Sequence, residues 1–228
     1  MKNFRSPPEW SSFEESWLQN YDEANYNNNL SSSVLKKTHT LIEKDKHLNS
    51  HYGVVLELGV GTMAHFPHVH HDYDEYIASD HDPNVIEFLE KRSWPEKVKI
   101  LELSGSQLPF DNNSVDRVIA THVLEHVNNP VAVLEEWTRV LKPGGVMSLI
   151  LPCDPGWAWR LGRNFGPRAS GEKAGLPYDY YMACEHINSI FNLKEIVKFH
   201  YPDRREWYWP LKVPLPDINL IYAVNCYV

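Results

Sequence analysis

Short apolar runs alternate with helical patterns through the middle of the chain. The apolar runs lie at 54–58, 76–79, 98–101, 117–120 and 146–151. Runs that are apolar along their whole length predict buried strands, and strands that alternate with helices are typical of a parallel sheet covered on both faces. The pattern therefore predicts a doubly wound α/β fold.

Helical segments are predicted from apolar stripes and from signals at their ends. The predicted helices lie at 11–19, 31–46, 83–91, 131–141 and 188–197. Pro83 stands near the first turn of one helix, and Lys142-Pro143-Gly144-Gly145 is predicted to end another. The last apolar run, 218–224, is interrupted by polar residues, which suits an antiparallel edge strand. The full prediction is a mostly parallel seven-stranded sheet with an antiparallel C-terminal edge.

Composition and charge narrow the class of protein. The chain has 228 residues, is 43% hydrophobic and 23% charged, and carries a formal net charge of −8, which is typical of one globular domain. The negative net charge disfavours binding to nucleic acid and to anionic membranes, because both are negatively charged themselves. No apolar run is long enough to span a bilayer, and the polar N-terminus does not resemble a signal peptide. Cys153, Cys184 and Cys226 are predicted to be free thiols, so we expect a cytoplasmic protein. The oligomeric state is not predicted.

A glycine turn and an acidic residue point to a ligand at the strand ends. Glu57-Leu58-Gly59-Val60-Gly61-Thr62 follows the first strand directly, and glycines there let the backbone turn sharply beneath a ligand. Asp80 ends the second strand, where a carboxylate can accept hydrogen bonds from both ribose hydroxyls of an adenosine. Two alternatives remain: the turn serves packing only, or Asp80 caps a helix and Asp82 is the ligand.

Two further motifs complete a family pattern. Gln107 to Asp116 includes Leu-Pro-Phe-Asp, and His122-Val123-Leu124-Glu125-His126 precedes Leu141-Lys142-Pro143-Gly144-Gly145. With the glycine turn and Asp80, these motifs resemble, in order and spacing, the class I methyltransferases of the UbiE type (methyltransferase type 11 family). The resemblance covers 53–152 and implies S-adenosylmethionine as the cofactor.

The resemblance also implies where the cofactor binds. Glu57, Gly59 and Gly61, with the adjacent Thr62, would border the methionine moiety, and Asp80, with the adjacent His81, would hold the ribose. Ser104, Gly105, Ser106 and Gln107 would lie beside the adenine, and Thr121 and His122 would line the pocket. The family usually has an aspartate where Ser104 stands and often a third glycine where Met63 stands, so we expect weaker cofactor binding.

The acceptor side is predicted from residues outside that pattern. Arginine forks suit phosphate or carboxylate, and aromatic faces suit a sugar or a ring. The candidate acceptor residues are Trp157, Arg160, Arg163, Arg168 and Tyr181, and the candidate catalytic residues are His186 and His126. For both histidines a packing or capping role is an alternative, and the cluster at 204–209 completes the pocket or covers the sheet edge.

The predicted activity is methyl transfer to an oxygen or nitrogen of a small acceptor that bears a phosphate or a sugar. The organisation expected is an N-terminal helical cap at 1–52, a cofactor-binding core at 53–152, and a substrate lid, last helix and C-terminal strands at 153–228. Two rivals are a cofactor-binding protein without catalysis, and an NAD(P)-dependent oxidoreductase, because Gly59-x-Gly61-x-x-Ala64 fits the relaxed dinucleotide pattern. His65, His68, His70 and His71 are expected in a surface loop, and no metal is predicted.

Overall fold

A seven-stranded sheet forms the centre of the protein, in a computed structural model that describes residues 30–164, 167–173, 175 and 177–228. The strand order is β3-β2-β1-β4-β5-β7-β6. The strands are β1 (His51–Leu58), β2 (Asp72–Asp80), β3 (Val98–Glu102), β4 (Val115–Thr121), β5 (Leu141–Pro152), β6 (Arg204–Trp209) and β7 (Ile221–Tyr227). The pairs among β1 to β5 are parallel, whereas β7 is antiparallel to β5 and β6. This confirms the predicted fold, including its antiparallel C-terminal edge.

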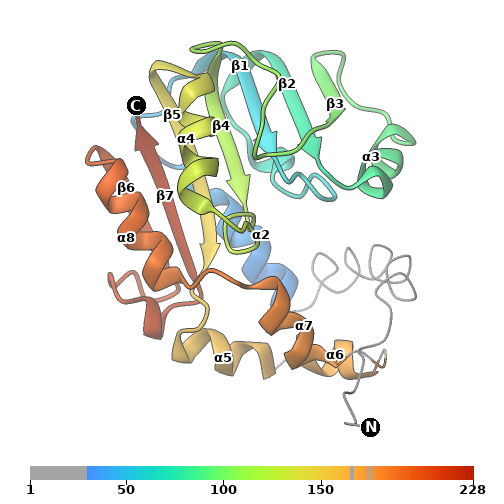
Figure 1. Cartoon of the computed structure of the whole chain (residues 1–228), viewed down its shortest axis with the longest axis vertical. Helices are drawn as coiled ribbons and strands as arrows, with labels where there is room; N and C mark the ends of the chain where they lie inside the picture. Colours follow the sequence, from blue (N-terminus) through green and yellow to red (C-terminus); the bar gives the residue numbers. More distant parts are fainter. Residues whose placement is uncertain (1–29, 165–166, 174, 176) are drawn as a thin grey trace, which may run out of the picture.

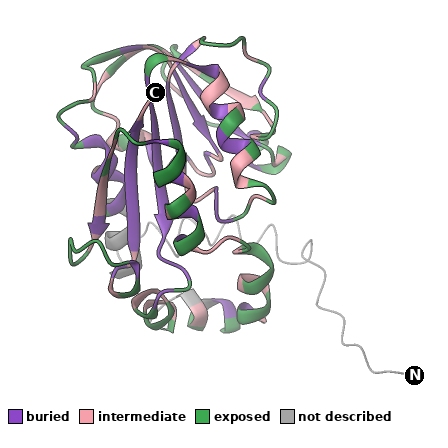
Figure 2. Ribbon diagram, turned by 60° about the vertical axis from the view of Figure 1, so that its left-hand side comes forward, coloured by how far each residue is buried: buried purple, intermediate pink, exposed green. Residues whose placement is uncertain are grey.

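Helices cover both faces of the sheet (Figure 1). The main ones are α2 (Leu30–Glu43), α3 (Pro83–Glu90), α4 (Pro130–Val140) and α8 (Ile190–His200). Alternate residues of the strands enter two separate cores: Leu56 and Leu58 pack on the α4 and α8 side, and Val55 packs on the α2 and α3 side. Each such side chain contributes about 1.5–3 kcal/mol by leaving water. Figure 2 shows the resulting buried strands between helices with exposed outer faces.

The end of α4 differs from the prediction. Asn129 caps the helix by accepting a hydrogen bond from the backbone N–H of Ala132, and Pro130 opens the first turn. The helix ends at Val140, however, and Leu141 already pairs with Val115 of β4. The Pro-Gly-Gly segment therefore lies inside β5, at a register shift of the sheet, rather than in a helix-ending turn.

Three short helices replace the loop expected after the fifth strand. They are α5 (Trp157–Asn164), α6 (Pro167–Lys173) and α7 (Tyr178–Glu185), and they lie beyond the carboxyl ends of β4 and β5 (Figure 1). Helices of two turns show too few apolar repeats to be detected by periodicity. The helix expected near 11–19 falls outside the described residues. Within the described part of the chain, no helix is long and apolar enough to cross a membrane.

The start of α8 offers a test of local stability. The Ser189 hydroxyl accepts a hydrogen bond from the backbone N–H of Asn192 at 3.3 Å. We expect Ser189→Ala to lower the free energy of unfolding by about 1 kcal/mol, because an N-cap acceptor is lost. Ser93→Ala, at an exposed loop position, is the control and should leave the urea midpoint unchanged. Equal midpoints for both variants would contradict the capping role.

Candidate functional site

The glycine turn and Asp80 form one hydrogen-bonded unit at the end of β1. Gly59 and Gly61 have positive φ angles of 65° and 50°. A Cβ on Gly59 would lie 2.5 Å from Cγ2 of Val123, whereas a Cβ on Gly61 would meet no atom within 4 Å. The Asp80 carboxylate accepts hydrogen bonds from the backbone N–H of Gly61 at 3.0 Å and of Asp82 at 3.1 Å. Open space therefore lies over Gly61, beside an oriented carboxylate.

The side chain of Asp82 caps a helix and makes no hydrogen bond to the glycine turn. Its carboxylate accepts from the backbone N–H of Asn84 at 2.9 Å and caps α3. The side chain of His81 is 83% exposed, with Nδ1 3.3 Å from Asp80. Thr62 is half-buried on the turn. Of the two aspartates that the sequence left open, Asp80 is the one that contacts the glycine turn.

Glu57 lies buried at the inner end of the turn. Its Oε2 accepts a hydrogen bond from the Tyr76 hydroxyl at 2.5 Å. Its Oε1 has no hydrogen-bond partner among the described residues. Burial raises the pKa of Glu57 above its ordinary value. The turn thus carries an unsatisfied buried acceptor at its base.

The two departures from the family pattern have visible structural consequences. Met63 is buried and has a φ angle of 61°, a left-handed conformation that is costly for a long side chain. Ser104 is exposed, and its hydroxyl lies 2.8 Å from that of Ser106. Gln107 is exposed as well, and the Gly105 carbonyl accepts a hydrogen bond from the Trp137 indole at 2.7 Å. The segment from Ser104 to Gln107 therefore has hydroxyl groups where the family usually has a carboxylate.

The loop after β4 connects the glycine turn to a group of ionisable side chains. Thr121 ends β4, and His122 follows with a φ angle of 59°. Nδ1 of His122 lies 3.4 Å from Oε1 of the buried Glu125, and Nε2 has no partner in the described part of the chain. Val123, in the same loop, is the side chain that fits against Gly59. The loop is therefore placed directly beside the turn.

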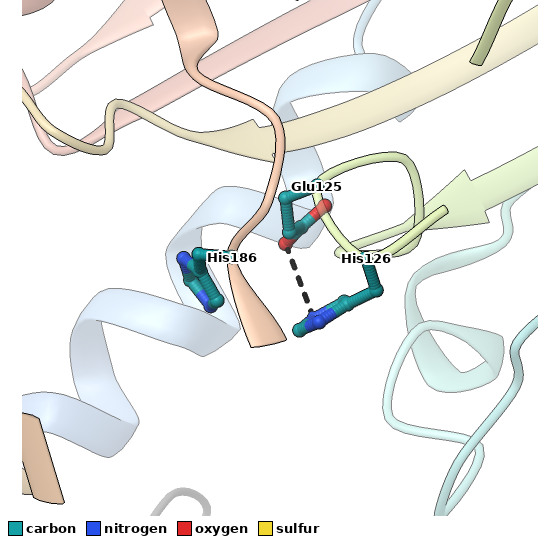
Figure 3. Close-up of side chains that lie close together, drawn as sticks. All are labelled: Glu125, His126 and His186. Carbon is teal, nitrogen blue, oxygen red and sulfur yellow. Dashed lines mark ion pairs between the residues drawn. The ribbon is translucent and has the colours of Figure 1, made fainter. Parts of the chain in front are cut away.

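His126 and His186 come together from segments 60 residues apart in the numbering. Their ring centroids lie 5.0 Å apart, nearly perpendicular, with the Glu125 carboxylate beside them (Figure 3). Asn188 holds the two segments together, because its side chain donates to the carbonyls of Leu124 and Val127 at 2.9 and 2.6 Å. The two candidate catalytic histidines thus share one site.

Each of these histidines has one ring nitrogen engaged by the protein. Nδ1 of His186 lies 2.8 Å from Oδ2 of the buried Asp154, and Nδ1 of His126 lies 3.0 Å from the Glu185 carbonyl. Since both partners accept hydrogen bonds, the protons are assigned to Nδ1, and Nε2 of each ring carries a lone pair. Burial lowers the pKa of His126, which favours this neutral form.

Glu125 is a buried carboxylate, only 1% exposed. Burial by itself would raise its pKa, but the hydrogen bond from His122 holds the pKa below its ordinary value. Its Oε1 lies 3.9 Å from Nε2 of His126, and its Oε2 has no partner among the described residues. The site therefore holds an ionised oxygen beside two imidazole lone pairs.

A cleft of about 520 Å³ opens next to His186. Three of the predicted acceptor residues, Arg160, Arg163 and Arg168, line it together with Asp154 and His186. The other two, Trp157 and Tyr181, are not among its lining residues, and Trp157 is 62% exposed. The volume is that of a small-molecule site.

The three arginines differ in what they contact. Arg168 is paired with Glu172 at 2.9 Å and with Asp179 at 2.7 Å, so it joins α6 to α7. Arg160 and Arg163 have no carboxylate within ion-pair distance among the described residues, and Arg163 lies 6.0 Å above the Tyr178 ring. Two guanidinium groups without an ion pair among the described residues therefore line the cleft.

The histidine-rich segment differs from the expected surface loop at His65. His65 is buried, with Nε2 3.0 Å from Glu43 of α2, and its ring lies near that of His39. Only His70 of the four histidines is exposed. The expectation was wrong at His65 because a partner from α2 makes its burial favourable.

The pattern of the core matches a known family. A family model described as a methyltransferase domain matches residues 56–149. This segment is a class I methyltransferase domain. A demethylmenaquinone methyltransferase of Staphylococcus aureus is 34% identical to the chain over 82 residues, which are 36% of this chain and 34% of that protein. The chain spans about a third of the length of the curated relatives that it matches.

Solved methyltransferases share the fold of nearly the whole chain. A methyltransferase of Thermotoga maritima, described as SAM-dependent and as a possible histamine N-methyltransferase, has a TM-score of 0.60 at 17% identity and covers 96% of this chain and 99% of its own. The plantazolicin methyltransferase BpumL, in complex with SAH, has a TM-score of 0.65 at 10% identity, covering 96% and 91%. At these identities the likeness supports the fold of the methyltransferase domain and its surroundings.

The groups at the glycine turn fit S-adenosylmethionine, the cofactor of this class. The space over Gly61 admits a ligand against the backbone. The Asp80 carboxylate, with two backbone donors, keeps lone pairs for ribose hydroxyls. The unpartnered Oε1 of Glu57 is an acceptor that the methionine ammonium group would satisfy.

Sequence reasoning missed three residues of the histidine site. Glu125 stands in the quoted motif but received no role, and neither Asp154 nor Asn188 was singled out. One signal was present, since the dipeptide Glu-His occurs both at Glu125-His126 and at Glu185-His186. Only the fold shows that these dipeptides meet.

Proposed function

We propose that this protein transfers the methyl group of S-adenosylmethionine to an oxygen or nitrogen atom of a small acceptor that carries a phosphate or a sugar. The observation that supports this most directly is the cleft beside His186, with Arg160 and Arg163 uncompensated at its wall. Guanidinium forks bind phosphate and carboxylate groups through paired hydrogen bonds. The acceptor's anionic part would lie on these arginines and its reacting atom near the histidines.

The residues around the glycine turn would bind and orient the cofactor, which when bound supplies a methyl group on a positively charged sulfur. In this proposal Gly59, Gly61 and Thr62 surround the methionine moiety, and Asp80 holds the ribose beside His81. Ser104 to Gln107 flank the adenine, and Thr121 and His122 close the pocket toward the acceptor. Alignment of the two reactants alone lowers the barrier by about 7–11 kcal/mol.

The histidine pair would activate the acceptor. A hydroxyl acceptor must lose its proton as the new bond to carbon forms, and two routes are open to the pair. Nε2 of His186 can take the proton, with Asp154 on Nδ1 stabilising the imidazolium that results. Alternatively, His126 and His186 can hold a cation that binds the acceptor oxygen.

The experiment combines cofactor binding with a search for acceptors. Titration calorimetry with S-adenosylmethionine, S-adenosylhomocysteine, NAD and NADP should give saturable binding of the two sulfur compounds alone. Release of S-adenosylhomocysteine should then be measured over matched pairs of sugars with and without a phosphate. Binding of a nicotinamide dinucleotide alone would overturn the proposal, and cofactor binding without turnover over the panel would favour a protein that has lost catalysis.

Arginine variants test the acceptor site. We expect Arg160→Ala and Arg163→Ala each to lower kcat/KM for a phosphorylated acceptor by about 10- to 100-fold, because each removes charged hydrogen bonds. Affinity for S-adenosylmethionine should stay unchanged. Arg205→Ala, on the outer strand β6, is the matched control. Equal kcat/KM values for all three variants would contradict this placement of the acceptor.

A further inference from the structure

Three side chains outside the cofactor turn form a preorganised set of metal ligands. Glu125, His126 and His186 each offer one atom, and these atoms all lie within 4.8 Å of one another. Figure 3 shows the carboxylate and the two rings gathered between the loop after β4 and the segment before α8. Ligands at about 2.1 Å from one ion lie about 3.4 Å apart, so side-chain rotations that bring the atoms closer by at most about 1.4 Å would allow all three to bind one ion.

Hydrogen bonds to His126 and His186 hold their rings in orientations that suit the binding of a cation. Nδ1 of each histidine is engaged, one by the Asp154 carboxylate at 2.8 Å and one by the Glu185 carbonyl at 3.0 Å. A partner on one ring nitrogen fixes the tautomer and leaves the other nitrogen as the ligand, which is the usual arrangement around protein-bound metals. Nε2 of each ring is therefore the nitrogen that is available to a metal ion.

Glu125 supplies the second, independent observation. The residue is 1% exposed, and its Oε2 has no hydrogen-bond partner among the described residues. Its Oε1 lies 3.9 Å from Nε2 of His126, which is too far for a hydrogen bond and leaves these two atoms without a direct bond to each other. A buried carboxylate in that position is costly unless a cation compensates it.

We infer that Glu125, His126 and His186 bind a divalent first-row transition-metal ion such as Zn²⁺, Mn²⁺ or Co²⁺. Two imidazole nitrogens and one carboxylate oxygen suit these ions better than Mg²⁺ or Ca²⁺, which prefer oxygen ligands alone. An ion held by three protein ligands keeps coordination positions for water or substrate. Because His186 also lines the arginine cleft, those positions are within reach of a bound acceptor.

The ion's role in catalysis rests on the proposed function. It would bind the acceptor through oxygen and favour the deprotonated form of a hydroxyl, whose proton passes to solvent. The acceptor oxygen would then form its bond to the methyl carbon as the carbon–sulfur bond breaks, with the electron pair remaining on sulfur. This narrows the acceptor class to hydroxyl compounds that also carry an anionic group.

Metal binding is tested first without any reaction. Full-length protein stripped with EDTA is titrated with Co²⁺ and Zn²⁺, using calorimetry and the visible absorption of Co²⁺, with Mg²⁺ as the comparison ion. We expect one transition-metal ion per chain and at least about 100-fold weaker binding for His126→Ala, His186→Ala and Glu125→Gln. Asp154→Asn, which changes only the residue that positions His186, should weaken binding by about 10- to 100-fold and shift the Co²⁺ bands.

The control is His70→Ala, in the other histidine-rich segment, which should bind Co²⁺ like the unmodified protein. The inference is overturned if no saturable binding occurs at one ion per chain, or if the His126 and His186 variants bind as tightly as the parent. His126 is the least buried of the three ligands, with 39% of its side chain exposed, so its variant keeps the test decisive if Glu125→Gln fails to fold. Titration of the same stripped protein with S-adenosylmethionine separates the two proposals, since cofactor binding without metal binding removes only the metal site.

Discussion

Asp80→Ala is expected to weaken the binding of S-adenosylmethionine by about 100-fold or more. A buried carboxylate that accepts two ribose hydroxyls contributes about 1.5–3 kcal/mol for each charged hydrogen bond, and 1.4 kcal/mol corresponds to a factor of ten in affinity. The variant also loses the acceptor for the Gly61 N–H, which orients the glycine turn. Titration calorimetry with S-adenosylmethionine and S-adenosylhomocysteine measures the change.

Two further variants separate the ribose contact from the shape of the turn. Asp80→Asn keeps an oxygen for the Gly61 N–H but removes the charge, so we expect an intermediate loss of about tenfold. Asp82→Ala removes a neighbouring carboxylate that caps α3, which should cost about 1 kcal/mol of stability and leave cofactor affinity within about threefold. Unchanged affinity in Asp80→Ala, or a large loss in Asp82→Ala, would assign the ribose to the other aspartate.

The parallel core was predictable because its signal is local. The strands β1, β2, β4 and β5 each contain a continuous buried run, so this run stands out in the sequence without knowledge of its neighbours. Gly59 is likewise a local requirement, although the reason for it, a Val123 side chain 2.5 Å from the missing Cβ, is visible only in the fold. The edge strand β6 was harder, because Arg204 to Trp209 mixes charged and aromatic residues.

The histidine site was predictable only in part. His126 and His186 were singled out from local context, but their meeting depends on the hydrogen bonds of Asn188 across two loops. Glu125 gave no signal of its own, because a glutamate in a polar loop is ordinarily exposed. The fold buries the Glu125 carboxylate and brings it beside the imidazole rings of His126 and His186. No periodic pattern in the sequence predicts this arrangement.

The buried pair of Glu43 and Arg117 is expected to dominate the stability of the N-terminal helix on the sheet. Arg117 of β4 contacts Glu43 of α2 through two nitrogens at 2.7 and 3.1 Å and donates to the Ser148 hydroxyl at 3.0 and 3.1 Å. Its side chain is fully buried and that of Glu43 is 2% exposed. We expect Arg117→Met to lower the free energy of unfolding by about 3–5 kcal/mol at pH 7, because the variant leaves an uncompensated carboxylate in the core.

The pH dependence of the free energy of unfolding identifies why Arg117→Met is less stable than the parent. Burial alone would raise the pKa of Glu43, but the charge of Arg117 and the hydrogen bonds from His65 and Arg117 hold it far below its ordinary value of 4.5. A depressed pKa stabilises the folded state above pH 4.5, and this contribution is lost as the pH falls further. In Arg117→Met the carboxyl is buried without its main cation, so its pKa rises and it takes up a proton at a higher pH than in the parent. Urea unfolding should therefore show the largest deficit at pH 7 and a smaller one near pH 4.5.

Replacing both partners distinguishes two causes of the lower stability. One is the loss of the attraction between Glu43 and Arg117, and the other is the cost of an ionised Glu43 that is buried without a cation. Arg117→Met combined with Glu43→Met leaves no ionised group to bury, and paired apolar replacements of this kind are often nearly neutral. The double variant should recover much of the stability lost by Arg117→Met, whereas Lys91→Met, which breaks the exposed pair with Glu87, should have no measurable effect. A double variant as unstable as the single one would show that packing around Arg117, rather than the charge of Glu43, carries the effect.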